Sequence, residues 1–169
     1  MDLWNAIAER VAEATGEPFE PAGHAALGGG CINSAARLEG RDGSRWFVKL
    51  NAASELHMFE AEAEGLAEMA EAGGVRVPRP LAWGSADGTA FLVMEHLDMG
   101  RGSGDTMRRF GRELAAMHRA TRRQFGWHRD NTIGSTPQPN GELPDWVDFY
   151  RERRLGFQLE LAARNGFRG

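Results

Sequence analysis

The chain has 169 residues, 41% hydrophobic and 26% charged, with a net charge of −4 and a pI near 5.8. That length suits one globular domain, or one domain and part of another, and the weak negative charge disfavours nucleic-acid or anionic-membrane binding. No apolar run reaches the roughly 20 residues of a membrane span, and one cysteine excludes internal disulfides. The first residues lack the basic and apolar regions of a signal peptide, so we expect a cytoplasmic protein.

Hydrophobic periodicity predicts the first elements of the chain. Residues 2–15 are expected to form an amphipathic helix, and residues 22–39 surround a run of glycines. A strand then follows over 46–51, and a helix over 54–72 with Ser54 as its N-cap. The two faces of the strand differ: one carries Trp46, Val48 and Leu50, and the other carries Phe47 and Lys49.

A second group of elements leads to the expected boundary between two lobes. Residues 75–84 contain two prolines, which predicts an extended connection, and residues 91–97 are expected to form a short apolar strand. The glycine-rich segment 100–104 is predicted to be a flexible linker. The division expected is therefore a first lobe over 1–99 and the start of a second lobe over 105–169.

The second lobe is predicted to be helical. Asp105 is a candidate cap for a helix ending at His118, a proline- and glycine-rich loop fills 130–144, and a last helix covers 145–165. The inward side chains expected on the two helices are Met107, Phe110, Leu114 and Met117, and then Trp146, Phe149, Phe157 and Leu161.

Three consecutive glycines, Gly28, Gly29 and Gly30, leave two interpretations open by themselves. Glycine-rich segments are common in surface turns, but their free N–H groups can also hold phosphate oxygens. Lys49 favours phosphate, because it is the only lysine among 20 basic residues and stands on the next strand expected. Its ammonium is a compact point charge that arginine cannot imitate.

The order of the parts indicates a function. A glycine-rich loop, a strand carrying lysine, a helix rich in glutamate, an apolar strand, a linker and then helices follow one another in the small lobe of kinase-like phosphotransferases. Gly28-x-Gly30-x-x-Asn33 is an incomplete form of the kinase loop, and the Gly-Lys-Ser/Thr sequence of a P-loop NTPase is absent.

Kinase lysines pair with a helix glutamate, and a helical wheel selects one here. With Phe59 at zero and 100° per residue, Glu62 falls on the apolar side with Leu66, whereas Glu60 and Glu64 fall on the side assigned to solvent. A carboxylate on an apolar face needs a partner. The sequence therefore predicts an ion pair between Lys49 and Glu62.

A second kinase-like match is rejected. His128-Arg129-Asp130 resembles a kinase catalytic loop, but Ser135 stands where that motif requires a metal-binding asparagine. The following segment shows no strand pattern for the usual hairpin, and Asp148 lies in a predicted helix. No catalytic residue and no metal ligand is therefore assigned in this chain.

Nearly the whole chain resembles the fructosamine (ketosamine) 3-kinases, relatives of the aminoglycoside phosphotransferases. The Cys-Ile-Asn after the glycines and the STPQPN sequence are not general kinase features. The matching segments are GGCIN (29–33), FVKLN (47–51), MFEAEAEGL (58–66), VPRPLAWG (77–84), FLVMEHLDM (91–99), GRELAAMHR (111–119), FGWHRDNTIGSTPQPN (125–140) and the W–F–ERRL–QLELA spacing of 146–162.

The resemblance implies an α+β fold, with a protein-kinase-like small lobe followed by the first helices of a helical lobe. It also implies ATP- and Mg²⁺-dependent phosphorylation of the 3-hydroxyl of sugar-derived ketoamines, including those on glycated proteins. Gly28 to Gly30 then cover phosphate, Lys49 and Glu62 form the pair, and Glu95, His96 and Leu97 form the hinge at the adenine. Residues 125–140 border the acceptor.

Family members run to nearly 300 residues and carry an HGDLWSGN-like catalytic loop and a later metal-binding aspartate, both beyond the position of Gly169. The alternative function is thus a non-catalytic nucleotide-binding or interaction module. Cys31, the only thiol, is a redox candidate that could link two chains, and a reduced structural residue is the other interpretation. Exposed apolar helix faces would also favour dimers.

Overall fold

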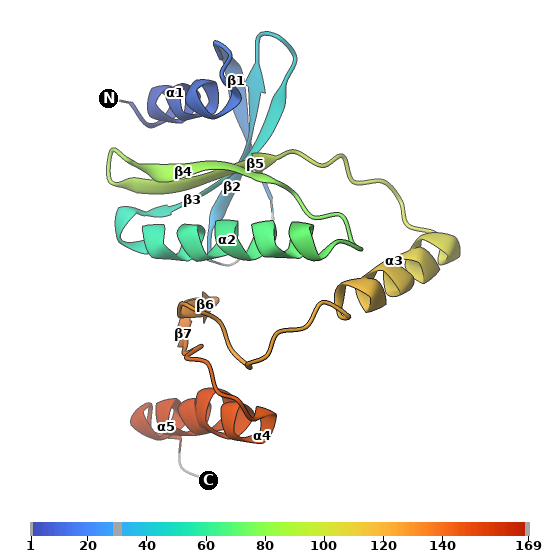
Figure 1. Cartoon of the computed structure of the whole chain (residues 1–169). Coiled ribbons are helices and arrows are strands. Elements are labelled where there is room, and N and C mark those ends of the chain that lie inside the picture. Colours follow the sequence, from blue (N-terminus) through green and yellow to red (C-terminus); the bar gives the residue numbers. More distant parts are fainter. Residues whose placement is uncertain (1, 29–31, 168–169) are drawn as a thin grey trace. The chain divides into compact units, whose positions relative to one another are not determined.

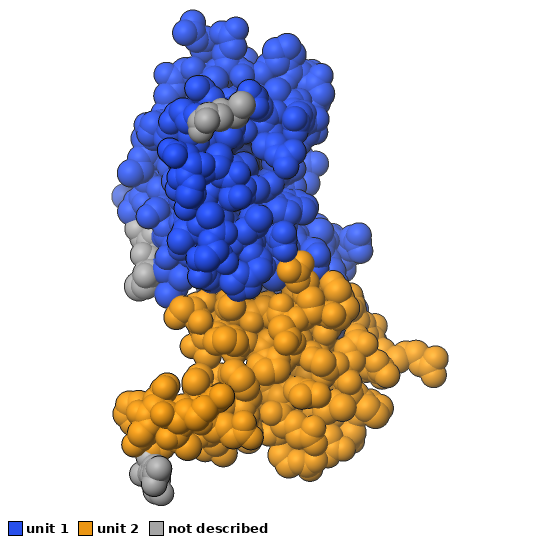
Figure 2. All heavy atoms as spheres, turned by 90° about the vertical axis from the view of Figure 1, so that its left-hand side faces the viewer, with its two compact units in different colours: residues 1–120 blue, residues 121–169 orange. Residues whose placement is uncertain are grey.

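The structure, a computed structural model, describes residues 2–28 and 32–167. Gly29, Gly30 and Cys31 of the expected phosphate loop therefore lie outside the described residues. The chain forms two compact units, Met1–Ala120 and Thr121–Gly169, which are coloured separately in Figure 2. The boundary falls after residue 120, and the separation of two lobes by the linker at 100–104 stays a prediction.

Unit 1 is built on a five-stranded antiparallel sheet in the order β1-β2-β3-β5-β4 (Figure 1). Every neighbouring pair is antiparallel, and β3 pairs with β5 rather than with β4, the next strand in sequence. The expected α+β class is therefore confirmed. The strands are β1 (Pro21–Leu27), β2 (Ser34–Gly40), β3 (Arg45–Ala52), β4 (Pro80–Ala86) and β5 (Thr89–Glu95).

A helix packs on each side of this sheet. Helix α1 (Leu3–Thr15) contributes Ile7 and Val11 to a buried cluster with alternate side chains of β2, β3 and β5. Helix α2 (Leu56–Ala72) contributes Phe59 to a second cluster with the other face of β5. β5 is buried on both faces, which explains why its sequence is almost continuously apolar.

The segment predicted as an extended connection contains a strand that the sequence analysis missed. β4 pairs with β5 through a tight hairpin in which Asp87 and Gly88 have φ angles of 49° and 72°. Asp-Gly is a favoured pair in such two-residue turns, because both positions need positive φ. Pro80 is tolerated since it begins an edge strand.

Two predicted helix caps are wrong. Ser54 lies inside a 3₁₀ turn, η1 (Ala53–Glu55), and α2 begins after it without a side-chain cap. Helix α3 (Gly104–Met117) is capped by Ser103, whose Oγ accepts a hydrogen bond from the Thr106 N–H at 3.2 Å. Asp105, the predicted cap, stands in the first turn and pairs with Arg108.

Unit 2 contains a small hairpin where a loop was predicted. β6 (Asn131–Ile133) and β7 (Thr136–Gln138) pair around Gly134, which has a φ of 61°. Sequence periodicity failed here because each strand has three residues, too few to show alternation. The expectation that this segment forms no hairpin is wrong.

The last predicted helix is present but irregular. It consists of α4 (Trp146–Phe149), a π-helical segment η2 (Tyr150–Gly156) and α5 (Phe157–Arg164). The π-helical turns change the phase of the helix, so a wheel drawn for an ideal α-helix cannot be continued across residues 150–156. Phe149 is buried as predicted, whereas Trp146 is 52% exposed. Among residues 2–28 and 32–167, no helix has the length and apolar character to cross a membrane.

Candidate functional site

The predicted ion pair forms on the sheet face that carries α2. Lys49 in β3 places its Nζ atom 2.5 Å from Oε2 of Glu62 in α2. The two side chains are 22% and 34% exposed, so water screens the pair only in part. The Lys49 ammonium also lies 5.9 Å from the centroid of the Phe59 ring. The selection of Glu62 as the partner of Lys49 is thus confirmed.

The rest of the helical wheel is less accurate. Glu60 and Glu64 are half-buried, although the wheel assigned them to solvent. Two small residues explain part of this difference, because Ala61 and Ala63 are both buried on different sides of α2. The helix is thus covered on more than one face, and its mostly alanine and glutamate composition conceals this.

At the predicted hinge, Glu95 ends β5 and is held to the segment that precedes β4. Its carboxylate accepts a hydrogen bond from Arg76 Nη2 at 2.5 Å, and its N–H donates to the Arg79 carbonyl at 2.9 Å. The Arg76 guanidinium keeps the pKa of the Glu95 carboxyl below its ordinary value. The start of the hinge is therefore tied to the sheet.

A second ion pair lies next to the other two residues of the predicted hinge. Asp98 accepts hydrogen bonds from both terminal nitrogens of Arg45, at 3.0 and 2.7 Å, and Arg45 is the main cause of its lowered pKa. His96 is largely buried, with Nδ1 3.7 Å from Asp98 Oδ1 and no hydrogen-bond partner among the described residues. Leu97, which lies between His96 and Asp98 in the sequence, is half-buried.

The described ends of the glycine-rich segment border the Lys49 strand. Gly28 follows β1 and is exposed, with open space where a Cβ atom would lie. After the segment, Asn33 precedes β2 and accepts a hydrogen bond from Asn51 Nδ2 at 2.7 Å. This contact was not predicted, since only the position of Asn33 in the glycine pattern was noted.

Unit 2 contains a polar network that the sequence analysis also missed. Asn140 is only 3% exposed and receives a hydrogen bond from Arg154 Nη2 on its Oδ1 at 2.7 Å. Its Nδ2 group donates to Asn131 Oδ1 at 2.8 Å, and Arg154 Nη1 donates to the Pro139 carbonyl at 2.6 Å. Burial lowers the pKa of Arg154, whose guanidinium also stacks on Phe149.

The two aspartates of the rejected catalytic match have local partners. Asp130 Oδ1 accepts the Asn140 backbone N–H at 2.7 Å, and Asp148, within α4, pairs with Arg151 at 2.7 Å. Across the described ranges, no three His, Cys, Asp or Glu side chains are grouped so as to hold a metal ion. The rejection of Asp130 as a catalytic residue stays a prediction.

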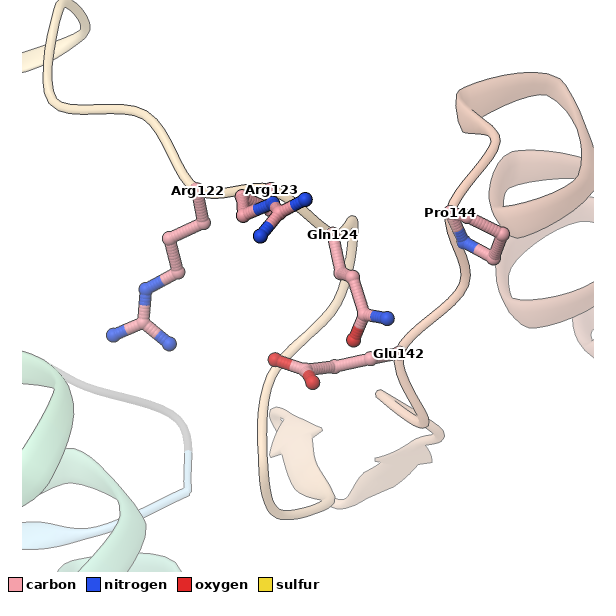
Figure 3. Close-up of a pocket in the computed structure, with 5 residues that line it drawn as sticks. All are labelled: Arg122, Arg123, Gln124, Glu142 and Pro144. Atoms are coloured by element: carbon pink, nitrogen blue, oxygen red, sulfur yellow. The ribbon is translucent and has the colours of Figure 1, made fainter.

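Unit 2 also has a surface hollow of about 510 Å³. Figure 3 shows the side chains of Gln124 and Glu142 directed toward each other, with Pro144 further along the segment that carries Glu142. Its remaining lining residues are Arg122 and Arg123. These residues are exposed and none is a buried polar group, so we assign no ligand to this hollow.

Three features together define the small lobe of a protein-kinase-like fold. They are the antiparallel sheet, the helix packed on one of its faces, and the strand lysine paired with a glutamate of that helix. The sequence model of the family described as fructosamine kinase matches residues 3–169. The chain belongs to this family.

Named relatives agree. A "Probable ketoamine kinase" of Synechocystis is 48% identical over 163 residues, which cover 95% of this chain and 55% of that protein. A chloroplastic "Protein-ribulosamine 3-kinase" of Arabidopsis thaliana is 47% identical over 139 residues, covering 80% and 42%. This chain thus spans about half the length of the relatives it matches.

Solved structures give the same result. A crystal structure named "Putative fructosamine-3-kinase" from Haemophilus somnus matches with a TM-score of 0.88 and 28% identity. Another of that name from Thermobifida fusca matches with a TM-score of 0.78 and 36% identity. Each match covers 96% of this chain and 55% of the solved chain.

Proposed function

We propose that unit 1 is the ATP-binding lobe of a ketoamine kinase, an enzyme that phosphorylates the 3-hydroxyl of sugar-derived ketoamines, free or on glycated proteins. The observation that carries this proposal is the ion pair between Lys49 and Glu62. In a kinase small lobe such a pair holds the lysine where it can bind nucleotide phosphates. Family membership and the names of the relatives support the acceptor class.

We assign the remaining proposed roles to other residues of unit 1. Gly28, with Gly29 and Gly30, would cover the phosphates, and the backbone of Glu95, His96 and Leu97 would meet the adenine. Glu95 and Asp98 are fixed by arginines, so this backbone is tied to the sheet before any ligand binds. Preordering of this kind reduces the entropy lost when a ligand binds.

Mg²⁺ would neutralise charge on the transferred phosphoryl group. The residues present do not fit a site for it, because no group of three potential ligands exists among the described side chains. We therefore derive no step through the metal from this chain. The segment 125–140 is proposed to border the acceptor, and the cytosol is the proposed compartment, although the Arabidopsis relative is named chloroplastic.

Calorimetry with the 169-residue chain tests nucleotide binding. We expect ATP to bind the wild type, and Lys49→Met and Glu62→Gln to weaken it by about tenfold or more, since each removes a partner of a charged hydrogen bond. Glu71→Gln is the matched control, because Glu71 is exposed on the same helix and should leave the affinity unchanged. Absence of ATP binding by the wild type would contradict the proposal.

Phosphoryl transfer is a separate test. A positioned general base contributes about 10²- to 10⁴-fold to such a reaction, and we assign no base in this chain. We expect ATP-dependent phosphorylation of fructoselysine by a full-length relative, and turnover far below it by this chain. Turnover within tenfold of the relative, abolished by Asp130→Asn, would show that the His128–Asp130 match is catalytic after all.

Self-association is proposed from exposed apolar side chains. Met107 and Phe110 on α3 are 65% and 44% exposed, on the side of the helix predicted to face inward. Exposed apolar faces favour dimers. Sedimentation should show a dimer that Phe110→Ser weakens, and non-reducing gels of wild type and Cys31→Ser after mild peroxide test the disulfide-linked alternative.

A further inference from the structure

A hydrogen bond between two asparagine side chains joins the end of the glycine-rich segment to the strand of Lys49. Asn51 Nδ2 donates to Asn33 Oδ1 at 2.7 Å, and both residues are half-buried. In the pairing of β2 with β3, Ser34 stands opposite Leu50, so Asn33 falls opposite Asn51. Lys49 lies two residues before Asn51 and therefore on the same face of the sheet.

The direction of this hydrogen bond is set by the backbone. The Ala52 N–H donates to Asn51 Oδ1 at 2.8 Å, which requires the oxygen of the Asn51 amide on that side. Asn51 therefore directs its NH₂ group toward Asn33, which accepts the hydrogen bond with its Oδ1 oxygen. The Nδ2 group of Asn33 is then directed away from Asn51, and no described residue accepts a hydrogen bond from it.

We propose that Asn51 is a positioning residue for nucleotide phosphates, because it orients Asn33 so that the Asn33 amide donates to a phosphate oxygen beside Lys49. This inference rests on the proposed function. Without Asn51, Asn33 could turn its carbonyl oxygen toward the phosphate, and two electron-rich oxygens would then face each other. The hydrogen bond from the Asn33 amide to a phosphate oxygen is charge-assisted, and such bonds are about twice as strong as neutral ones.

Calorimetric titration of the 169-residue chain with ATP, ADP and adenosine tests this role. We expect Asn51→Ala and Asn33→Ala each to weaken ATP and ADP binding by about tenfold, the usual loss for one hydrogen bond to a charged group. Adenosine has no phosphate, so its affinity should change by less than about twofold. The double variant should bind ATP no more weakly than Asn33→Ala, since the two substitutions remove the same contact with phosphate.

Ser44→Ala is the matched control. It removes a side-chain hydrogen bond of 2.7 Å, from Ser44 Oγ to Asp42, at the closed end of the same β2–β3 hairpin. We expect it to leave all three affinities unchanged. If Asn51→Ala fails to fold, Asn33→Ala still tests the phosphate contact that Asn51 would position, because Asn33 lies outside β2.

The outcomes separate the two proposals. Wild-type binding of ATP with unchanged affinity in Asn51→Ala would overturn the role of Asn51 and leave the proposed function standing. An equal loss of ATP and adenosine affinity would also overturn it, because a purely structural defect predicts that result. Absence of nucleotide binding by the wild type would overturn the proposed function and this inference together.

Discussion

Different kinds of interaction stabilise the interiors of the two units. Every hydrophobic side chain found buried in the described residues belongs to unit 1, apart from Phe149, and the one buried polar residue, Asn140, belongs to unit 2. Unit 1 therefore relies on apolar burial, which is non-directional and tolerates small shifts. Unit 2 relies on hydrogen bonds around Asn140 and Arg154, which fail when an angle or a length changes.

Charge also separates the units. The sequence gives residues 1–120 a net charge of −6 and residues 121–169 a net charge of +2. Arginine is the source of this difference, because unit 2 uses its guanidinium groups both on the surface and in its polar core. Substitutions in the two cores should therefore have effects of different size and different chemical origin.

The largest expected effect is in the apolar core of unit 1. Phe91 is 1% exposed in the cluster formed with Ile7, Leu38 and Val93. Phe91→Ala should lower the free energy of unfolding by about 3–5 kcal/mol, through lost burial and the cavity left behind. Urea unfolding measures this, with Met99→Ala, at a residue 89% exposed, as the control. A cost below about 1 kcal/mol would show that apolar burial does not dominate unit 1.

The next effect concerns the polar core of unit 2. Arg154→Met keeps much of the side-chain volume but leaves the Asn140 Oδ1 and Pro139 carbonyl oxygens without their donor. We expect a loss of about 2–3 kcal/mol, confined to unit 2. Hydrogen exchange of individual segments measures it, with the exposed Arg164→Met as the control. Equal changes in the hydrogen-exchange rates of both units would contradict the expectation that the substitution destabilises unit 2 alone.

A smaller effect is expected on binding. Lys49→Arg keeps the positive charge beside Glu62 but replaces a compact ammonium by a planar group. ATP affinity should fall by about tenfold. Calorimetry compares this variant with the wild type, and an unchanged affinity would mean that only the charge matters at this position.

The smallest effect is a pH dependence at the hinge. Arg76 lowers the pKa of Glu95 from its ordinary value of 4.5, so the unfolded chain binds more protons there than the folded protein. The pair therefore stabilises the fold fully above pH 4.5, and this contribution is lost as the pH falls through the lower folded-state pKa. Because Arg76 is 72% exposed, solvent weakens the pair.

Thermal unfolding at several pH values checks this last prediction. Between neutral pH and pH values below 4.5, the wild type should lose more stability than Arg76→Gln, which has no cation to lower the Glu95 pKa. Identical slopes for the two proteins would contradict the assignment of the ion pair.

Sequence patterns predicted the parts of the molecule that depend on long periodic segments. Helix α1, strand β3 and the pairing of Lys49 with Glu62 follow from alternation or helical spacing over many residues. β4 was missed although Asp87-Gly88 is a strong hairpin signal, because the prolines before it drew the interpretation toward an extended connection.

Other features could not be predicted from local patterns. The contacts of Asn140 with Arg154 and of Asn33 with Asn51 join residues 14 and 18 positions apart, and polar residues show no periodicity that marks such partners. The π-helical segment 150–156 also has no signal in the apolar spacing, and Trp146, which precedes it in α4, was placed inward although it is exposed. These features depend on tertiary geometry rather than on spacing.

The Lys49–Glu62 pair has a consequence for the chemical labelling of this chain. Lys49 is the only lysine, so amine-selective reagents have one side-chain target, and Glu62 and the surrounding residues leave that side chain 22% exposed. Among the side chains, a reagent that acylates amines therefore reports the occupancy of one defined position, distinct from the α-amino group. Reducing sugars react with the same functional group, so the side chains of this chain offer them a single, partly shielded amine.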